Sequence, residues 1–224
     1  MKNLSTMVYF ATDEFLLDEH LFLYFYDKVS SYRKQKIDRL KMPEDKRLSL
    51  LSGLLLEYAL NDIGEVDKEI LEDENGKPHL KDCDINFSLS HSGNVAMCAV
   101  SKYPVGCDVE KVREINLKIA KRYFCKEETE NIFSFTKEND RIDAFFRLWT
   151  LKESYVKAIG KGLAIPLNSF RVNLDNPPKT MGEKQEFLFS EFNCFDGYKC
   201  AVCTTSREKV ELKVITLEQL KKVF

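Results

Sequence analysis

A weak internal repeat restricts the fold of this sequence more than any other feature. The segment Arg47–Leu51 resembles Arg147–Leu151, and each lies in a predicted helix. Each half of the chain then closes with a similar apolar segment, Val95–Ser101 or Tyr198–Thr204. The spacing of roughly 100 residues is too long for a solenoid, so we expect two similar halves that face each other. Chance likeness between leucine-rich helices is the alternative explanation.

Local patterns predict that each half mixes helices and strands, which makes the fold class α+β. We place the N-terminal half at residues 1–104 and the C-terminal half at residues 105–224. Helices are predicted at residues 32–40, 43–61, 117–124, 127–135 and 140–159 and at the C-terminus. Strands are predicted at residues 7–11, 86–90, 95–100, 105–109, 170–174, 186–192, 198–205 and 210–215. Ligands often bind where two such halves meet, so we expect a ligand cleft between them.

Composition limits the classes of partner. The 224 residues carry a formal net charge of -2, which argues against a dedicated nucleic-acid-binding protein. We find no signal peptide and no run of about 20 apolar residues, so we expect no membrane partner and a cytoplasmic location. The seven cysteines indicate a reducing compartment. Cys200 and Cys203 form a lone C-x-x-C on a predicted strand, where their odd separation sends them to opposite faces.

Two carboxylates on one predicted strand form the first candidate site. In Gly106–Glu110, Asp108 and Glu110 are two residues apart and share a face, whereas Cys107 and Val109 point into a core. Carboxylate oxygens are ligands that Mg²⁺ prefers, together with phosphate oxygens and waters. A solvated strand face is the alternative.

A helical stripe adds a third carboxylate. Trp149, Glu153 and Lys157 recur at a spacing of four beside an apolar stripe in the predicted helix 140–159. An ordinary Glu153–Lys157 ion pair would explain this spacing. Together with Asp108 and Glu110, however, Glu153 could complete a metal site beside a lysine suited to phosphate.

Two short segments offer further phosphate donors. Ser90 and His91 end a strand before the Ser92–Asn94 turn, and hydroxyl, imidazole and turn amides all donate to phosphates. Lys77, in Gly76-Lys77-Pro78, could also meet a phosphate. A structural histidine and a plain surface turn are the alternatives.

The ordered set of these motifs resembles the 4'-phosphopantetheinyl transferases of the surfactin-synthetase type. That family shows G-K-P, F-N-x-S-H-S, G-[IV]-D-x-E and W-x-x-K-E-[AS]-x-x-K in this order. The matching segments here are Gly76-Lys77-Pro78, Asn86–Ser92, Gly106–Glu110 and Trp149–Lys157, and the likeness continues through Gly160–Leu163. Cys107 departs from the usual Ile or Val, but a free cysteine packs as a small hydrophobe.

The resemblance implies an α+β fold of two similar halves related by pseudo-twofold symmetry, with coenzyme A in the cleft. It implies Mg²⁺, or Mn²⁺, held by Asp108, Glu110 and Glu153. We take Glu153 as the base for the carrier serine, acting directly or through a metal-bound water. It also implies roles at the phosphates of coenzyme A for Lys157, Ser90 and His91. Further coenzyme A contacts implied by the resemblance are Arg33, Lys36, Ser49, Gly76, Lys77, Pro78 and Asp108.

The implied activity is transfer of the 4'-phosphopantetheine arm from coenzyme A to a serine of an apo acyl or peptidyl carrier protein, with release of 3',5'-ADP. The basic residues between Lys111 and Lys126 could meet an acidic carrier, although an ordinary amphipathic helix explains them equally well. A metal-dependent phosphoesterase or nucleotidyl transferase and a non-catalytic carrier-binding module are the rival functions. Because both halves occur in one chain, we expect a monomer.

Overall fold

The structure, a computed structural model, describes residues 5–74, 76–161, 165–174, 178–181 and 187–224. Gly162 and Leu163, which extend the family resemblance, lie outside these ranges, as does Glu186 at the start of a predicted strand. Across the described ranges, no helix combines the length and apolarity that a bilayer crossing requires.

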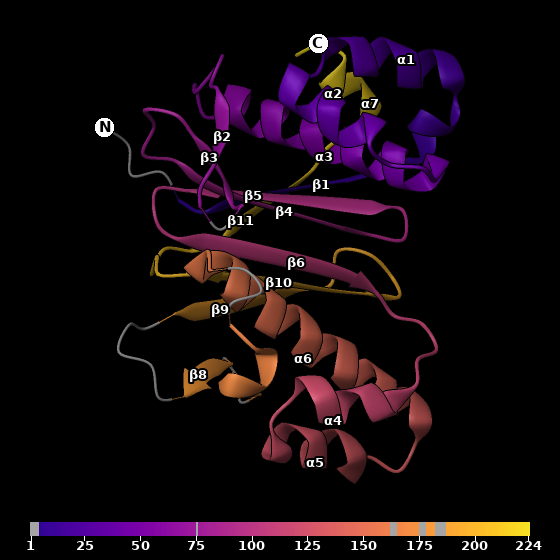
Figure 1. Cartoon of the computed structure of the whole chain (residues 1–224), viewed down its shortest axis with the longest axis vertical. Coiled ribbons are helices and arrows are strands. Elements are labelled where there is room, and N and C mark those ends of the chain that lie inside the picture. The colour runs from indigo at the N-terminus through magenta and orange to yellow at the C-terminus, as the bar shows by residue number, and fades with distance from the viewer. Residues whose placement is uncertain (1–4, 75, 162–164, 175–177, 182–186) are drawn as a thin grey trace.

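Two sheets stack in the middle of the molecule and helices cover their outer faces (Figure 1). The first sheet has the strand order β11-β1-β5-β4. Its strands are β1 (Met7–Thr12), β4 (Asn86–Ser92), β5 (Val95–Ser101) and β11 (Glu211–Val214). The helices on its outer face are α1 (Glu19–Lys28), α2 (Ser31–Asp38), α3 (Pro43–Asp62) and the C-terminal α7 (Leu217–Leu220). A small hairpin of β2 (Ile70–Glu72) and β3 (Pro78–Leu80) lies beside them.

The second sheet has the order β6-β10-β9-β8-β7. Its strands are β6 (Val105–Lys111), β7 (Arg171–Asn173), β8 (Lys179–Met181), β9 (Leu188–Phe192) and β10 (Tyr198–Thr204). The helices on its outer side are α4 (Ala120–Tyr123), α5 (Lys126–Ser134) and the long α6 (Glu138–Ile159). Short 3-10 helices occupy Glu14–Leu17, Leu117–Ile119 and Leu167–Ser169.

The two halves share one order of elements, which is what the internal repeat predicts. In the first half, β1 is followed by helices and by the antiparallel pair β4-β5, and β5 returns to pair with β1. In the second half, β6 is followed by helices and by the antiparallel pair β9-β10, and β10 returns to pair with β6. The repeated helical segments lie in α3 and α6, and the repeated strands are β5 and β10. The α+β class is therefore confirmed, whereas an exact twofold relation stays a prediction.

Three apolar cores among the described residues follow from this layering. One lies between the first sheet and α3, whose leucines at 50, 51, 54, 55 and 56 are all buried. Another lies between the second sheet and α6 and includes four residues of the predicted stripe, Phe145, Leu148, Leu151 and Tyr155, whereas the fifth, Ile159, is partly buried against it. The third fills the space between the sheets, where Val8, Phe10 and Met97 meet Cys107 and Val109. Burial of this apolar area fixes the two halves against each other.

Cys200 lies in the core between the sheets and Cys203 in the core under α6, so the prediction that they face opposite ways is confirmed. Both thiols are free. Burial raises the pKa of each, to about 12 for Cys200. A buried thiol with a raised pKa is a packing residue rather than a reactive one.

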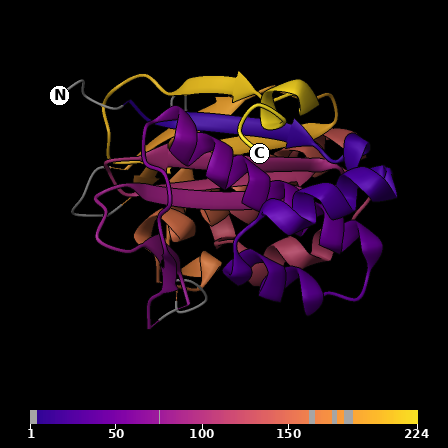
Figure 2. The ribbon, with the colours of Figure 1, turned by 90° about the horizontal axis from the view of Figure 1, so that it is seen from above.

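The short strands β2, β3 and β8 form where no strand is predicted, and two larger features also differ from the sequence expectations. First, β11 pairs in parallel with β1, and Figure 2 shows this yellow C-terminal strand beside the indigo N-terminal one. Ile215 and Leu220 are buried in the core under the first sheet. The end of the chain therefore packs with the N-terminal half, although the sequence division assigns it to the C-terminal half. Second, α1 forms in an aromatic stretch for which no helix is predicted.

Candidate active site

A cavity of about 520 Å³ lies between the two halves and collects most of the predicted site residues. The first half contributes Arg33 and Lys36 from α2, Ser52 from α3, Pro78 from β3, and Ser90 and His91 from β4. The second half contributes Asp108 and Glu110 from β6, and Trp149, Glu153 and Lys157 from α6. Segments far apart in the sequence thus meet at the predicted cleft.

A second cavity, of about 710 Å³, adjoins the first and shares Glu153 and Lys157 with it. Its other walls are mostly apolar and come from both halves. They include Pro78, Phe87, Leu89, Tyr123, Trp149, Val156, Ile165 and Leu167. The two cavities together form a long cleft that is charged at one end and apolar at the other.

The strand β6 presents its acidic side chains toward α6, as the alternation predicts. Val109 and Cys107 are fully buried between the sheets, whereas Asp108 and Glu110 line the first cavity. The Asp108 side chain is only 6% exposed. Its Oδ1 accepts hydrogen bonds from the Ser90 hydroxyl at 2.7 Å and from Lys157 Nζ at 2.6 Å.

Glu110 is half-buried, and its Oε2 accepts a hydrogen bond from the Ser92 hydroxyl at 2.8 Å. Arg113 Nη1 approaches the same oxygen at 3.4 Å. Each of the two acidic residues on β6 is therefore held by a serine of β4 as well as by a cation.

Gly106 lets α6 approach this strand closely. A Cβ atom at position 106 would lie 2.0 Å from the carbonyl oxygen of Ser154 and 2.3 Å from the amide nitrogen of Ala158. Only glycine therefore allows the backbones of β6 and α6 to pack at this distance, which brings Glu153 and Lys157 beside Asp108.

Electrostatic interactions connect the acidic groups in the cleft. Burial, together with the neighbouring Asp108 and Glu110 carboxylates, raises the pKa of Glu153, although Lys157 opposes this. Burial lowers the pKa of Lys157, but the contact with Asp108, together with the nearby Cys107 and Glu153, outweighs burial and raises it overall. Lys157 is thus ion-paired with Asp108, and the alternative of a simple Glu153–Lys157 helix pair is not what the structure shows.

The donor set suits a hard divalent cation. Asp108 Oδ2 is buried and has no hydrogen-bond partner among the described residues. Burial, and after it the Asp108 and Glu110 carboxylates, disfavour the ionised form of Glu153, and a cation held between these acids would relieve that cost. Within the described ranges, no three His, Cys, Asp or Glu side chains already converge as a metal site. Carboxylate oxygens with an unpaired buried atom among them nevertheless fit Mg²⁺.

On the opposite wall, the structure groups Arg33, Lys36 and His91. Arg33 is 8% exposed, and its Nε has no hydrogen-bond partner in the described part of the chain. The Arg33 side chain packs directly against Gly53, where a larger residue would collide with it. Lys36 Nζ pairs with Glu72 at 3.0 Å. Desolvation, with Lys157 and Arg33 nearby, lowers the pKa of His91.

Two of the predicted coenzyme A contacts, Ser49 and Ser90, differ from the rest in their position or their hydrogen bonding. Ser49 is buried on α3 and is not among the residues that line either cavity, whereas Ser52, about one turn along the same face, lines the first one. Ser90 lines the cavity, but its hydroxyl donates a hydrogen bond to the Asp108 carboxylate. A role at a phosphate stays a prediction for both Ser49 and Ser90.

The Gly76-Lys77-Pro78 segment lies at the apolar end of the cleft. All three residues line the second cavity, and Pro78 also lines the first. Lys77 Nζ donates to the carbonyl oxygen of Lys157 at 2.9 Å, which joins the hairpin of one half to the helix end of the other. Burial lowers the pKa of Lys77.

Sequence reasoning missed several residues of the cleft. Tyr32 and Ser52 line the first cavity, and Phe87 and Leu89 line both. Phe87 and Leu89 lie within a segment that was matched to the family, and their alternation with serines was the available signal. No local pattern marked Tyr32 or Ser52, because only the packing of α2 against α3 brings them to the cavity.

A cleft that combines three carboxylates with lysine, arginine and histidine has the charged groups that suit a phosphorylated ligand together with a divalent cation. Comparison with known proteins is consistent with a ligand of this kind. The family described as the 4'-phosphopantetheinyl transferase superfamily matches residues 104–203.

Relatives extend the match across both halves. The 4'-phosphopantetheinyl transferase gsp of Aneurinibacillus migulanus is 36% identical over 209 residues, which cover 90% of this chain and 87% of that protein. The 4'-phosphopantetheinyl transferase Sfp of Bacillus subtilis is 33% identical over 201 residues, which cover 86% of this chain and 89% of that protein. The chain therefore belongs to the 4'-phosphopantetheinyl transferase superfamily.

A solved structure, the holo-[acyl-carrier-protein] synthase of Thermotoga maritima, shows a partial likeness. It has a TM-score of 0.39 and 22% identity and covers 46% of this chain and 62% of that chain. A likeness at this level adds nothing to the family assignment.

Proposed function

We propose that this protein transfers the 4'-phosphopantetheine arm of coenzyme A to a serine of an apo carrier protein and releases 3',5'-ADP in a Mg²⁺-dependent reaction. One observation carries the proposal above the others. In a member of this family, Asp108, Glu110, Glu153 and Lys157 line one cavity with Arg33, Lys36 and His91. Coenzyme A has phosphates at both ends of its nucleotide, so it needs cationic groups on both walls of such a cavity.

The carboxylates of Asp108, Glu110 and Glu153 would hold the cation. When bound, it would neutralise charge on the diphosphate of coenzyme A. Lys157 is placed in the same wall as these acids and meets the charge that develops on the leaving 3',5'-ADP. Arg33, Lys36 and His91, on the other wall, bind the phosphate at the adenosine end.

The chemical step breaks one bond to phosphorus and forms another. The carrier serine oxygen attacks the β-phosphorus, the bond to 3',5'-ADP breaks, and the serine proton must be accepted. We assign Glu153 as its acceptor, because Asp108 is engaged by Ser90 and Lys157 and Glu110 by Ser92. General bases of this kind typically contribute about 10²–10⁴-fold to a rate.

The apolar cavity extends from Glu153 and Lys157 toward Tyr123, Trp149 and Leu167. We propose that the uncharged pantetheine arm lies along it, since burial of its apolar groups is favourable there. Six basic residues from the end of β6 to the start of α5 are all exposed to solvent, and their charge would steer an acidic carrier toward this mouth of the cleft. These residues are Lys111, Arg113, Lys118, Lys121, Arg122 and Lys126.

Mass spectrometry of an apo carrier, incubated with the protein, coenzyme A and Mg²⁺, tests the proposal. A carrier mass gain of about 340 Da, the mass of the arm, supports transfer. Cleavage of coenzyme A with no change in carrier mass would instead indicate a phosphoesterase, and binding without any turnover would indicate a carrier-binding module. Several apo carriers should be compared, because fatty-acid, polyketide and peptide synthesis all use them.

Glu153→Gln should remove at least about 10²-fold of the transfer rate while leaving the fold intact. The matched control is Glu138→Gln, the same change at an exposed position in the first turn of the same helix. If both variants modified the carrier at the native rate, Glu153 would have no part in the chemistry.

A further inference from the structure

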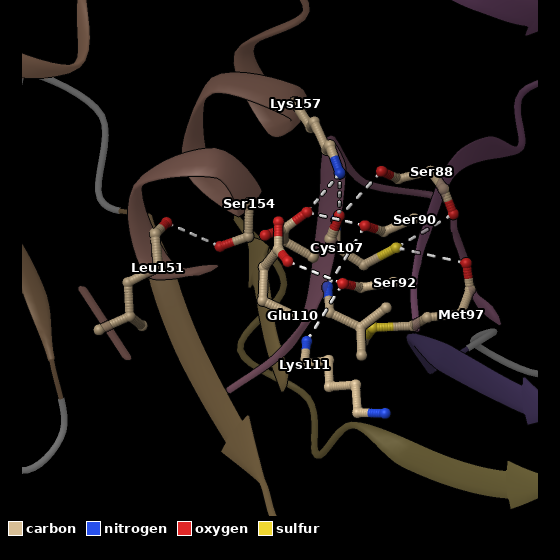
Figure 3. A network of polar contacts seen from close by, with 12 residues as sticks. Ser88, Ser90, Ser92, Met97, Cys107, Glu110, Lys111, Leu151, Ser154 and Lys157 are labelled. Atoms are coloured by element: carbon tan, nitrogen blue, oxygen red, sulfur yellow. Dashed lines mark hydrogen bonds and ion pairs between the residues drawn. The ribbon is translucent and has the colours of Figure 1, made fainter. Parts of the chain in front are cut away.

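Three serines alternate along β4 and face β6 (Figure 3). Both strands are sheet edges, because β4 ends the first sheet and β6 ends the second. The amides of Cys107, Val109 and Lys111 donate to the hydroxyl oxygens of Ser88, Ser90 and Ser92 at 3.0, 3.3 and 3.1 Å. Side-chain hydroxyls thus satisfy the edge amides of β6 that another strand would normally pair.

Two of these serines also hold a carboxylate. Ser90 donates to Asp108 Oδ1 at 2.7 Å, and Ser92 donates to Glu110 Oε2 at 2.8 Å. A serine hydroxyl has one proton to donate. The serine oxygen accepts a hydrogen bond from a β6 amide, and the serine hydroxyl donates one to the carboxylate. Each serine is therefore held in a single orientation, and it orients the carboxylate that it contacts.

We propose that Ser92 is a positioning residue, which orients the Glu110 carboxylate for the divalent cation, and that Ser90 does the same for Asp108. The inference rests on the proposed function. It means that a strand of the N-terminal half sets the orientation of metal ligands carried by the C-terminal half. Hydrogen-bonded partners behind a ligating carboxylate fix its direction, and their loss typically weakens metal binding.

Substitution of Ser92 tests the proposal more sharply than substitution of Ser90. Asp108 keeps its contact with Lys157 when Ser90 is lost. Within the described part of the chain, Glu110 would keep only the longer contact with Arg113, whose side chain is 59% exposed. Removal of the Ser92 hydroxyl should therefore free the Glu110 carboxylate to a greater extent than removal of the Ser90 hydroxyl frees Asp108.

Ser88 provides a matched control. Its hydroxyl oxygen accepts a hydrogen bond from the Cys107 amide in the same way, but among the described residues it makes no hydrogen bond to an acidic side chain. Ser88→Ala removes one bond between β4 and β6, as Ser92→Ala does, and leaves both serine–carboxylate contacts in place. Ser92→Thr keeps a hydroxyl at this half-buried position.

The experiment measures Mn²⁺ binding by electron paramagnetic resonance, at a fixed concentration of coenzyme A and without a carrier, so that no turnover occurs. Ser92→Ala should raise the Mn²⁺ dissociation constant by about 10- to 100-fold. Ser88→Ala should leave it unchanged, and Ser92→Thr should restore most of the native value. In carrier assays, the Mg²⁺ concentration needed for half-maximal rate should rise in parallel for Ser92→Ala alone.

Equal Mn²⁺ dissociation constants for the native protein and Ser92→Ala would overturn the inference, as would an equal rise in Ser88→Ala, which would show a loss of packing only. Either result leaves the proposed function intact as long as the native protein adds the arm to the carrier. If the native protein gives no carrier mass gain, the proposed function itself fails.

Discussion

Replacing Gly106 by alanine should disable the site through a displacement that its geometry makes unavoidable. The added Cβ would lie 2.0 Å from the Ser154 carbonyl oxygen and 2.3 Å from the Ala158 amide nitrogen, both of them backbone atoms of α6. Non-bonded contacts relax only at about 3.5 Å, so strand and helix must separate by more than about 1 Å. Asp108 and Glu110 move with the strand, whereas Glu153 and Lys157 move with the helix.

A misplacement of about 1 Å between reacting groups can lower a rate by about 10²-fold. The same overpacking should reduce the free energy of unfolding by about 1–3 kcal/mol. We therefore expect the kcat/KM of Gly106→Ala for an apo carrier to fall by about two orders of magnitude. Urea denaturation, measured at the assay temperature, gives the folded fraction to which the rate is normalised.

Gly64→Ala is the control for this substitution. Gly64 has φ 82°, and apart from its neighbours in the chain no atom of the described residues lies within 4 Å of the Cβ that alanine would add. The variant should lose roughly 1–2 kcal/mol of stability through the left-handed backbone alone and keep the native rate. A Gly106→Ala protein with native kcat/KM would refute the argument that close packing of α6 on β6 sets the catalytic geometry.

Two predictions concern stability. Lys152 and Glu128 form a fully buried ion pair at 2.8 Å. Lys152→Met should cost about 3–5 kcal/mol of unfolding free energy, because it leaves the Glu128 carboxylate without its counter-ion. In urea denaturation, the double variant Lys152→Met with Glu128→Gln should recover part of this loss. Burial alone would raise the pKa of Asp62, but hydrogen bonds from Lys213 and Tyr9 outweigh burial and lower it. The stabilising contribution of Asp62 is therefore complete above the pKa that this group has in the unfolded chain, and it is lost as pH falls through the lower pKa of the folded state. Thermal unfolding of Asp62→Asn should therefore differ from the native protein at neutral pH and approach it in acid, and a constant difference at all pH values would contradict the assignment.

The sequence predicted the facing of side chains best where the periodicity was strong and each side had a different environment. On β6, apolar and acidic residues alternate, and the structure buries Val109 between the sheets while Asp108 lines the cleft. On α6, the apolar stripe and the Glu153–Lys157 stripe lie on the predicted sides. In both elements the local pattern contained all the information, because burial selects the face.

The sequence failed where local signals were weak or where the partner was distant in sequence. Helix α1 begins at an Asp18 cap, whose carboxylate accepts the amides of His20 and Leu21, but its many aromatic residues hid the helical period. The parallel pairing of β11 with β1 joins the two ends of the chain and has no local signature. The bond from Ser92 to Glu110 likewise exists only once two sheet edges meet.

The division of the cleft between two halves explains why residues outside it should matter to its chemistry. The acidic groups and Lys157 come from β6 and α6, whereas Arg33, Lys36 and His91 come from the first half. A ligand with phosphates at two ends can contact both sets only if the halves keep one separation. Because interiors are packed like crystals and resist small shifts, the core between the sheets, which includes Met97, fixes that separation without lining the cleft. The serines of β4 orient individual carboxylates of β6 across the same junction. The geometry of the site therefore depends on how the two halves pack together as much as on its own residues.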